Sequence, residues 1–164
     1  MKWSEILSQW DSGNYPKIPS HLKSPYFWRT SVLKSKKDLE YKEEFLEDER
    51  LLNAKEDSTP FLEHLNKKKD EKYAISFPNL SGDTTLVIPI PRKIKKFTNL
   101  FYFMNKASEI QKRELWKKVA LEANKMLKDN DNIWISTHSL GVNYLHVRIC
   151  NNPKYYENSK LKKK

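Results

Sequence analysis

The sequence predicts an α+β fold in which a single, mostly antiparallel sheet has helices packed on one face. Three observations support this class: short β-branched and aromatic runs bounded by Pro and Gly, one long amphipathic segment, and a C-terminal segment that alternates with period two. Four or more strands interrupted by helices, ending in a hairpin, fit such a domain.

The N-terminal segment combines a short helix with a strand. Residues 3–10 are predicted to be helical because four apolar residues recur there at helical spacing: Trp3, Ile6, Leu7 and Trp10. Three prolines make residues 14–25 an extended connection. The aromatic and β-branched run YFWRTSVL then predicts a strand over residues 26–33.

A densely charged segment follows over residues 36–57. Because Tyr41, Phe45 and Leu52 lie near one helical face, we predict a mostly exposed helix there. The Thr-Pro pair at residues 59–60 is typical of an N-cap followed by proline at the first helical position, and it predicts a short helix through about residue 66.

The second half of the chain carries the clearest pattern. YAISF and TTLVIPI predict two strands with a turn between them, and NLFYFMN predicts a short aromatic helix. Ser108, with Gln111 three residues later, forms a capping-box pattern that opens a helix to about Lys128. The apolar stripe of this helix is predicted to contain Ile110, Leu115, Val119, Ala123 and Met126/Leu127. Two strands joined by a Gly-containing turn follow within residues 132–156.

The length of 164 residues predicts a single domain over residues 1–158. Within it, residues 1–57 form an N-terminal extension with helices and one strand, and residues 159–164 follow as a disordered basic tail. No apolar run approaches the roughly 18 residues of a membrane span, so no membrane partner is expected. The single cysteine, Cys150, excludes an internal disulfide and suits a reducing interior, which favours a cytoplasmic location.

The net charge of +10 leaves two interpretations open. A basic second half attracts polyanions, which makes nucleic acid a candidate partner. However, only five of the 31 basic residues are Arg, and a lysine excess of this kind also arises from composition and solubility alone.

The strand at the end of the hairpin carries the candidate site. By alternation, Tyr144, His146, Arg148 and Cys150 point to one side of this strand. Arg148 offers a planar fork of donors for phosphate or carboxylate, Tyr144 adds a hydroxyl donor, and His146 is the candidate catalytic residue because it titrates near neutrality. The alternative is structural, with His146 and Arg148 paired to carboxylates on a neighbouring strand.

Two further residues are candidates for binding the same ligand. His138 lies in the predicted turn beside two hydroxyls and a glycine, where backbone N–H groups can bind an anion. Arg92 follows a proline-terminated strand and is placed to close over an anion. No spacing of Cys and His fits a metal, so neither a metal site nor a cofactor is expected.

The motifs FPNLSGDTTLVIPIPR, ISTHSLGVNYLHVRI and NPKYY occur in this order and resemble a domain family of unknown function found in large DNA viruses and assorted microbes. The resemblance covers roughly Phe61 to Tyr156, which marks residues 59–156 as the core of the domain. It implies no activity. If the protein is viral, its location would be the host cell cytoplasm or the virion.

The layout also resembles the histidine-triad nucleotide hydrolases, in which three alternating histidines bind and attack a phosphate. The corresponding row in this chain holds His146, Arg148 and Cys150. Because arginine occupies the middle position, the resemblance implies a chemistry that is altered or absent.

Together these observations predict a domain that binds a phosphorylated or other anionic ligand, a nucleotide included, on its Tyr/His/Arg strand face. A degenerate enzyme of phosphoester type is one form of this hypothesis, and the residues leave open whether any reaction occurs. The alternative is a non-enzymatic basic protein that binds nucleic acid or packs in a virion.

Overall fold

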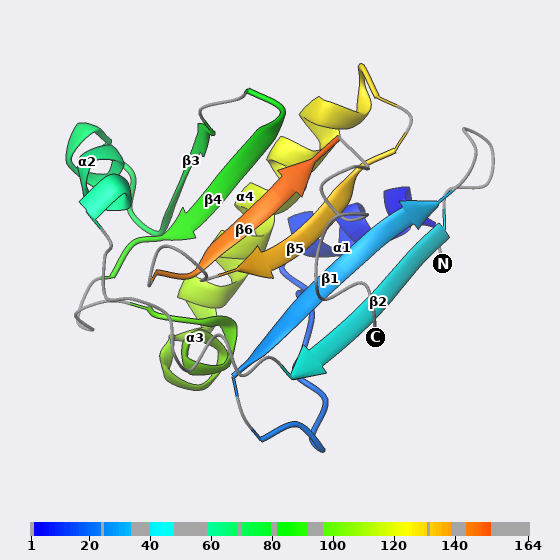
Figure 1. Ribbon diagram of the computed structural model, residues 1–164, viewed down its shortest axis with the longest axis horizontal. Helices are drawn as coiled ribbons and strands as arrows, with labels where there is room; N and C mark the ends of the chain where they lie inside the picture. Colours follow the sequence, from blue (N-terminus) through cyan, green and yellow to red (C-terminus); the bar gives the residue numbers. More distant parts are fainter. Residues whose placement is uncertain are drawn as a thin grey trace.

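The computed structural model describes residues 2–23, 25–33, 40–47, 59–68, 70–79, 82–91, 97–130, 132–138 and 144–151 (Figure 1). The predicted tail at residues 159–164, Arg92 and most of the turn after residue 138 lie outside these ranges.

A six-stranded sheet forms the centre of the described part of the chain, with strand order β2-β1-β5-β6-β4-β3. Every neighbouring pair is antiparallel, which confirms the predicted α+β class with one antiparallel sheet. The strands are β1 (Tyr26–Leu33), β2 (Glu40–Glu47), β3 (Ala74–Pro78), β4 (Thr84–Pro89), β5 (Trp134–His138) and β6 (His146–Cys150).

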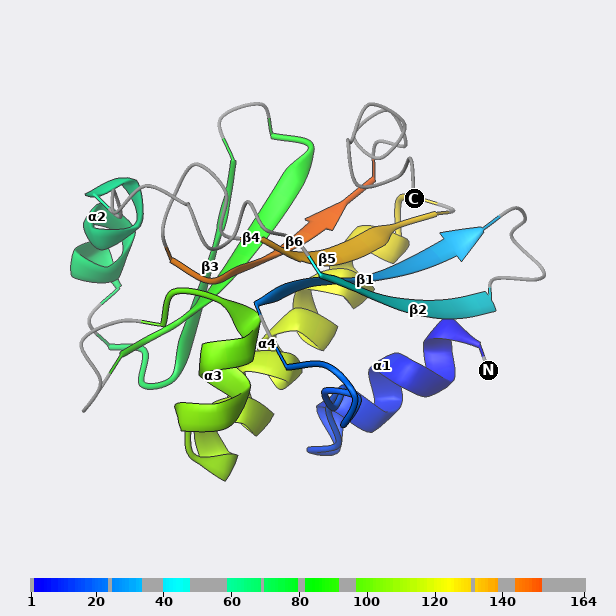
Figure 2. The ribbon, with the colours of Figure 1, turned by 60° about the horizontal axis from the view of Figure 1, so that its bottom comes forward.

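The helices are α1 (Trp3–Asp11), α2 (Thr59–Lys67), α3 (Leu100–Lys106) and α4 (Glu109–Leu127). Figure 2 shows α1, α3 and α4 together beneath one face of the sheet, which we call the helix face. The main core lies between these helices and strand residues such as Trp28, Val87, Ile135 and Val147. Helix α2 lies beside β3 and packs Phe61 against the other side of the sheet, which we call the opposite face.

Helix α4 begins as its capping box predicts. The Ser108 hydroxyl accepts from the Gln111 amide at 3.2 Å, and the Gln111 side chain accepts from the Ser108 amide at 2.8 Å, so two amides of the first turn are satisfied. The buried stripe differs in part from the prediction. Ile110 is 40% exposed, whereas Trp116 and Ala120 are fully buried beside the predicted positions.

The predicted helix over residues 36–57 is wrong where the structure describes it, because residues 40–47 form β2. Tyr41 and Phe45 are four residues apart, and this spacing places two side chains on one side of a helix and of a strand alike. On the strand both rings pack against the main core. The three residues between them are all charged, so the local pattern does not distinguish the two structures, and the pairing with β1 decides for the strand.

Three tryptophans join the helix layer to the sheet. The ring centroid of Trp116 on α4 lies 5.2 Å from that of Trp10 on α1 and 4.9 Å from that of Trp28 on β1. Trp10 and Trp28 complete the cluster at 5.9 Å. The N-terminal helix and strand therefore share one core with α4.

None of the helices in the described part of the chain is long and apolar enough to cross a membrane.

Replacing Trp116 by alanine is expected to lower the free energy of unfolding by about 3–5 kcal/mol, because the substitution leaves a cavity between α1, β1 and α4. Leu121→Ala on the same helix is the matched control. Leu121 is 48% exposed, so its loss is expected to change stability by less than about 0.5 kcal/mol. Urea unfolding followed by circular dichroism measures both values, and equal effects of the two substitutions would contradict the assigned core.

Candidate functional site

Strands β5 and β6 occupy the middle of the sheet and carry the candidate site. Val147 and Ile149 of β6 are buried in the main core on the helix face. The residues between and beside them, His146, Arg148 and Cys150, therefore point to the opposite face. The predicted alternation holds across the whole of β6.

Tyr144 precedes β6 and is fully buried. Its hydroxyl donates to the Pro89 carbonyl at 2.6 Å, and its ring packs edge-on against Phe61 of α2, with the centroids 6.0 Å apart. Burial raises the pKa of this phenol. The hydroxyl that was predicted to bind a ligand is thus engaged in joining β6 to the end of β4.

His146 is a buried imidazole, only 5% exposed. Its Nδ1 atom lies 2.9 Å from the Tyr144 carbonyl, and its ring centroid lies 5.0 Å from that of Phe61. A carbonyl oxygen can only accept, so Nδ1 carries the proton in this contact and Nε2 is left with a lone pair. Burial lowers the pKa of His146 to about 4, against the opposing effect of the Tyr144 carbonyl, and the charge of Arg148 lowers it further. The ring is therefore neutral at physiological pH.

A row of polar residues crosses the opposite face through strands β1, β5 and β6. In register, Arg29 pairs with Ser136, and Ser136 pairs with Arg148. Side chains at paired positions lie on the same face, and adjacent strands are about 4.8 Å apart, so the two arginines stand about 10 Å apart at their backbones. Ser136, between them, is 3% exposed.

Arg29 belongs to this row but was not predicted as a site residue. Its Nε donates to Glu44 of β2 at 2.7 Å, and the guanidinium and carboxylate form an ion pair. The alternation of YFWRTSVL does indicate its side of the strand, because Tyr26 and Trp28 are buried and the odd-numbered Arg29 lies on the other face. Its position beside Ser136 depends on a strand more than 100 residues away, which periodicity alone does not identify.

His138 differs from its predicted place. It is the last residue of β5, in register with His146, and does not lie in the turn. Arg92 lies outside the described residues, so its part in the site remains a prediction. The described residues include no group of three or more His, Cys, Asp or Glu side chains placed to hold a metal ion.

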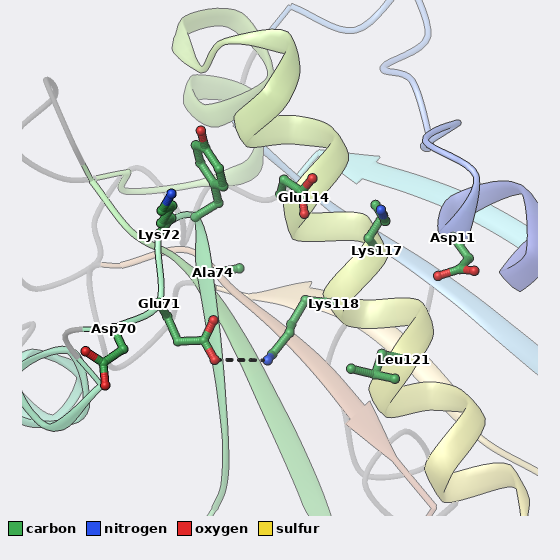
Figure 3. A pocket seen from close by; sticks show the side chains of 10 residues that line it. Asp11, Asp70, Glu71, Lys72, Ala74, Glu114, Lys117, Lys118 and Leu121 are labelled. Carbon is green, nitrogen blue, oxygen red and sulfur yellow. Dashed lines mark ion pairs between the residues drawn. The ribbon is translucent and has the colours of Figure 1, made fainter.

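A cavity of about 450 Å³ lies elsewhere, between α4 and the start of β3. Figure 3 shows charged side chains of both signs around it, with an ion pair between Lys118 of α4 and Glu71 at 3.6 Å. These charges largely compensate one another, so the lining favours no one class of ligand. None of the predicted site residues lines this cavity.

Comparison with known proteins identifies a family but no characterised relative. The model of a family of unknown function, DUF6940, matches residues 4–162. This match extends the predicted resemblance toward the N-terminus, through α1, β1 and β2. No curated protein and no solved structure matches the chain.

The buried His146 predicts a pH-dependent stability. Its pKa is about 4 in the folded protein and about 6.5 when unfolded, so the unfolded chain binds a proton that the folded chain does not. The contribution of the neutral ring to the free energy of unfolding is fully present above about pH 6.5. It is lost as the pH falls toward 4, which lowers the free energy of unfolding by an amount on the order of 3 kcal/mol.

Urea unfolding at several pH values between about 4 and 7 tests this prediction. The variant His146→Gln is expected to show a shallower fall in stability than the wild type. His21→Gln replaces an exposed histidine and is expected to keep the wild-type slope. If both variants follow the wild-type curve, His146 is not the buried titrating group.

Proposed function

The chain belongs to DUF6940, a family of unknown function, and we propose that it binds a small anionic ligand on the opposite face of its sheet. The observation that supports this proposal is the in-register row Arg29–Ser136–Arg148 across three adjacent strands. A guanidinium beside a hydroxyl matches the donor pattern that phosphate and carboxylate groups require, and Arg29, ion-paired with Glu44, adds a second guanidinium at the other end of the row.

The proposed site uses the two arginines differently. Arg29 donates to Glu44 of β2, on the side of β1 away from Ser136, so its charge is shared with that carboxylate and it contributes less to the site. Arg148 stands on the other side of Ser136 and supplies the second fork. Because Ser136 and His146 are both nearly buried, hydrogen bonds to a ligand there would be little weakened by competition from water.

His146 contributes a hydrogen-bond acceptor beside the row. With Nδ1–H directed at the Tyr144 carbonyl, the ring carries its lone pair on Nε2, which makes that atom an acceptor. A neutral imidazole with a lowered pKa is no proton donor at pH 7. The geometry thus supports a binding role, whereas a buried imidazole with a pKa of about 4 is a weak base and a poor catalyst for a phosphoester reaction.

The middle residue of the series His146, Arg148 and Cys150 along β6 supports binding over catalysis of the histidine-triad kind. Arg148 occupies the place of the attacking histidine in that layout. A guanidinium stays protonated and has no lone pair for attack, whereas it binds a phosphate well.

Isothermal titration with inorganic phosphate, pyrophosphate and adenosine monophosphate tests the proposal. Arg148→Gln is expected to weaken the binding of the best of these ligands by roughly 10- to 100-fold, since a hydrogen bond to a charged group contributes about 1.5–3 kcal/mol. Arg148→Lys is expected to recover part of the loss, because it restores the charge without the fork.

Arg113→Gln is the matched control, because Arg113 is exposed on α4 beneath the helix face. It removes the same charge and is expected to leave affinity unchanged. Circular dichroism of each variant confirms that the fold is retained. If none of the three ligands binds, or Arg113→Gln weakens binding as much as Arg148→Gln, the proposed site is wrong. Binding only to single-stranded DNA or RNA, with a steep dependence on salt, would instead favour the basic nucleic-acid-binding alternative.

A further inference from the structure

A second cavity, of about 600 Å³, lies on the helix side of the sheet, away from the Arg29–Ser136–Arg148 row. Its walls come from the connection between α1 and β1 on one side and from α3 and the start of α4 on the other. In Figure 2 this connection passes beneath the sheet, on the same side as α3. The volume is within the range of small-molecule sites, about 300–1,000 Å³.

Part of the lining of this cavity is apolar. Ile18 and Leu22 of the connection and Phe101 and Met104 of α3 line it, and all four are partly buried side chains that pack against the main core. The connection is also ordered by its own turn, in which the Leu22 amide donates to the Pro19 carbonyl at 3.1 Å. The apolar surface is therefore formed before any ligand arrives.

A hydrogen-bonded network joins the connection between α1 and β1 to the start of α4 at one wall of the cavity. The Tyr15 hydroxyl donates to Glu109 at 2.5 Å, and Lys112 pairs with the same carboxylate at 2.9 Å. The hydrogen bond from Tyr15 is the main cause that lowers the pKa of Glu109. This carboxylate is thus ionised, and its charge is compensated by Lys112.

The remaining charge around the cavity is positive. Lys17 and Lys23 line it and are exposed, and neither forms a salt bridge with any residue in the described part of the chain. Partly buried apolar side chains together with two exposed lysines match a ligand that has an apolar body and an anionic end. Lys17 also acts on Glu109 at longer range, but the lining as a whole keeps an excess of positive charge, which distinguishes this cavity from the one beside β3.

We propose that this cavity binds an amphipathic carboxylate, with the apolar chain on Ile18, Leu22, Phe101 and Met104 and the carboxylate at Lys17 and Lys23. The site is separate from the Arg29–Ser136–Arg148 row, since it lies beneath the helix face and shares no residue with that row. Its proposed ligand class is also different, because the cavity combines apolar side chains with lysines, whereas the row presents arginines and a serine.

Sodium octanoate is the probe, and the methyl signals of the methionines report on its position. Titration is expected to shift the Met104 methyl signal, with a Kd of about 1 mM or below, and to leave Met126, packed elsewhere against the core, in place. Acetate lacks the chain and octan-1-ol lacks the charge, so each is expected to bind roughly tenfold more weakly than octanoate.

Two variants separate the contributions of charge and apolar surface. The double variant Lys17→Gln, Lys23→Gln is expected to weaken octanoate binding roughly tenfold without affecting octan-1-ol, and Leu22→Ser is expected to weaken both. The matched controls are Lys42→Gln with Lys67→Gln, and Leu62→Ser, all at exposed positions outside the cavity. Arg148→Gln is expected to leave octanoate binding unchanged, so that this proposal and the proposed anion site can fail independently.

Three outcomes would overturn the proposal. The first is no shift of the Met104 signal at octanoate concentrations up to about 10 mM. The second is an equal shift of Met126, which would indicate general binding to apolar surface. The third is a double lysine variant that binds octanoate as the wild type does.

Discussion

Contact among Trp10, Trp28 and Trp116 is the interaction on which the rest of the structure depends. Each ring comes from a different element, so the cluster is the place where α1, the sheet and α4 meet. The indole N–H groups of Trp28 and Trp116 find no acceptor among the described residues. A buried donor without an acceptor costs about 1–3 kcal/mol, so apolar burial and ring packing must outweigh this cost.

The tryptophan cluster also determines which side chains of β1 lie on the opposite face of the sheet. Since Trp28 is held in the main core, its neighbour Arg29 must point to the opposite face. The register with β5 is reinforced at the same place, where the Trp28 amide donates to the Thr137 hydroxyl at 3.2 Å and this hydroxyl donates back to the Trp28 carbonyl at 3.4 Å. The polar row on β1, β5 and β6 is thus a consequence of aromatic packing on the helix face.

Features determined by neighbouring residues were predictable from the sequence. The ends of β1, the capping box of α4 and the alternation of β6 all follow from local chemistry, and the structure has them. Features that depend on distant pairing were not. The strand at residues 40–47 is recognisable only from its partner β1, and Arg29 joins the site only through β5. Tyr144 was assigned the correct side, but its hydroxyl bond to the Pro89 carbonyl depends on how β4 ends, which no periodicity describes.

The pairing of β1 with β5 also affects how the chain acquires its structure during synthesis. Trp28 and Thr137, which bond across this pair, are separated by 109 positions in the chain. At about 5–20 residues per second, a ribosome needs on the order of ten seconds to extend the chain from one to the other. Throughout that interval the aromatic side of β1 has neither its central strand partner nor, for much of it, the ring of Trp116. In the nascent chain only α1 and β2 are available to cover Trp28, so the part of this aromatic surface that β5 and α4 cover later stays exposed, and such surface is prone to aggregation.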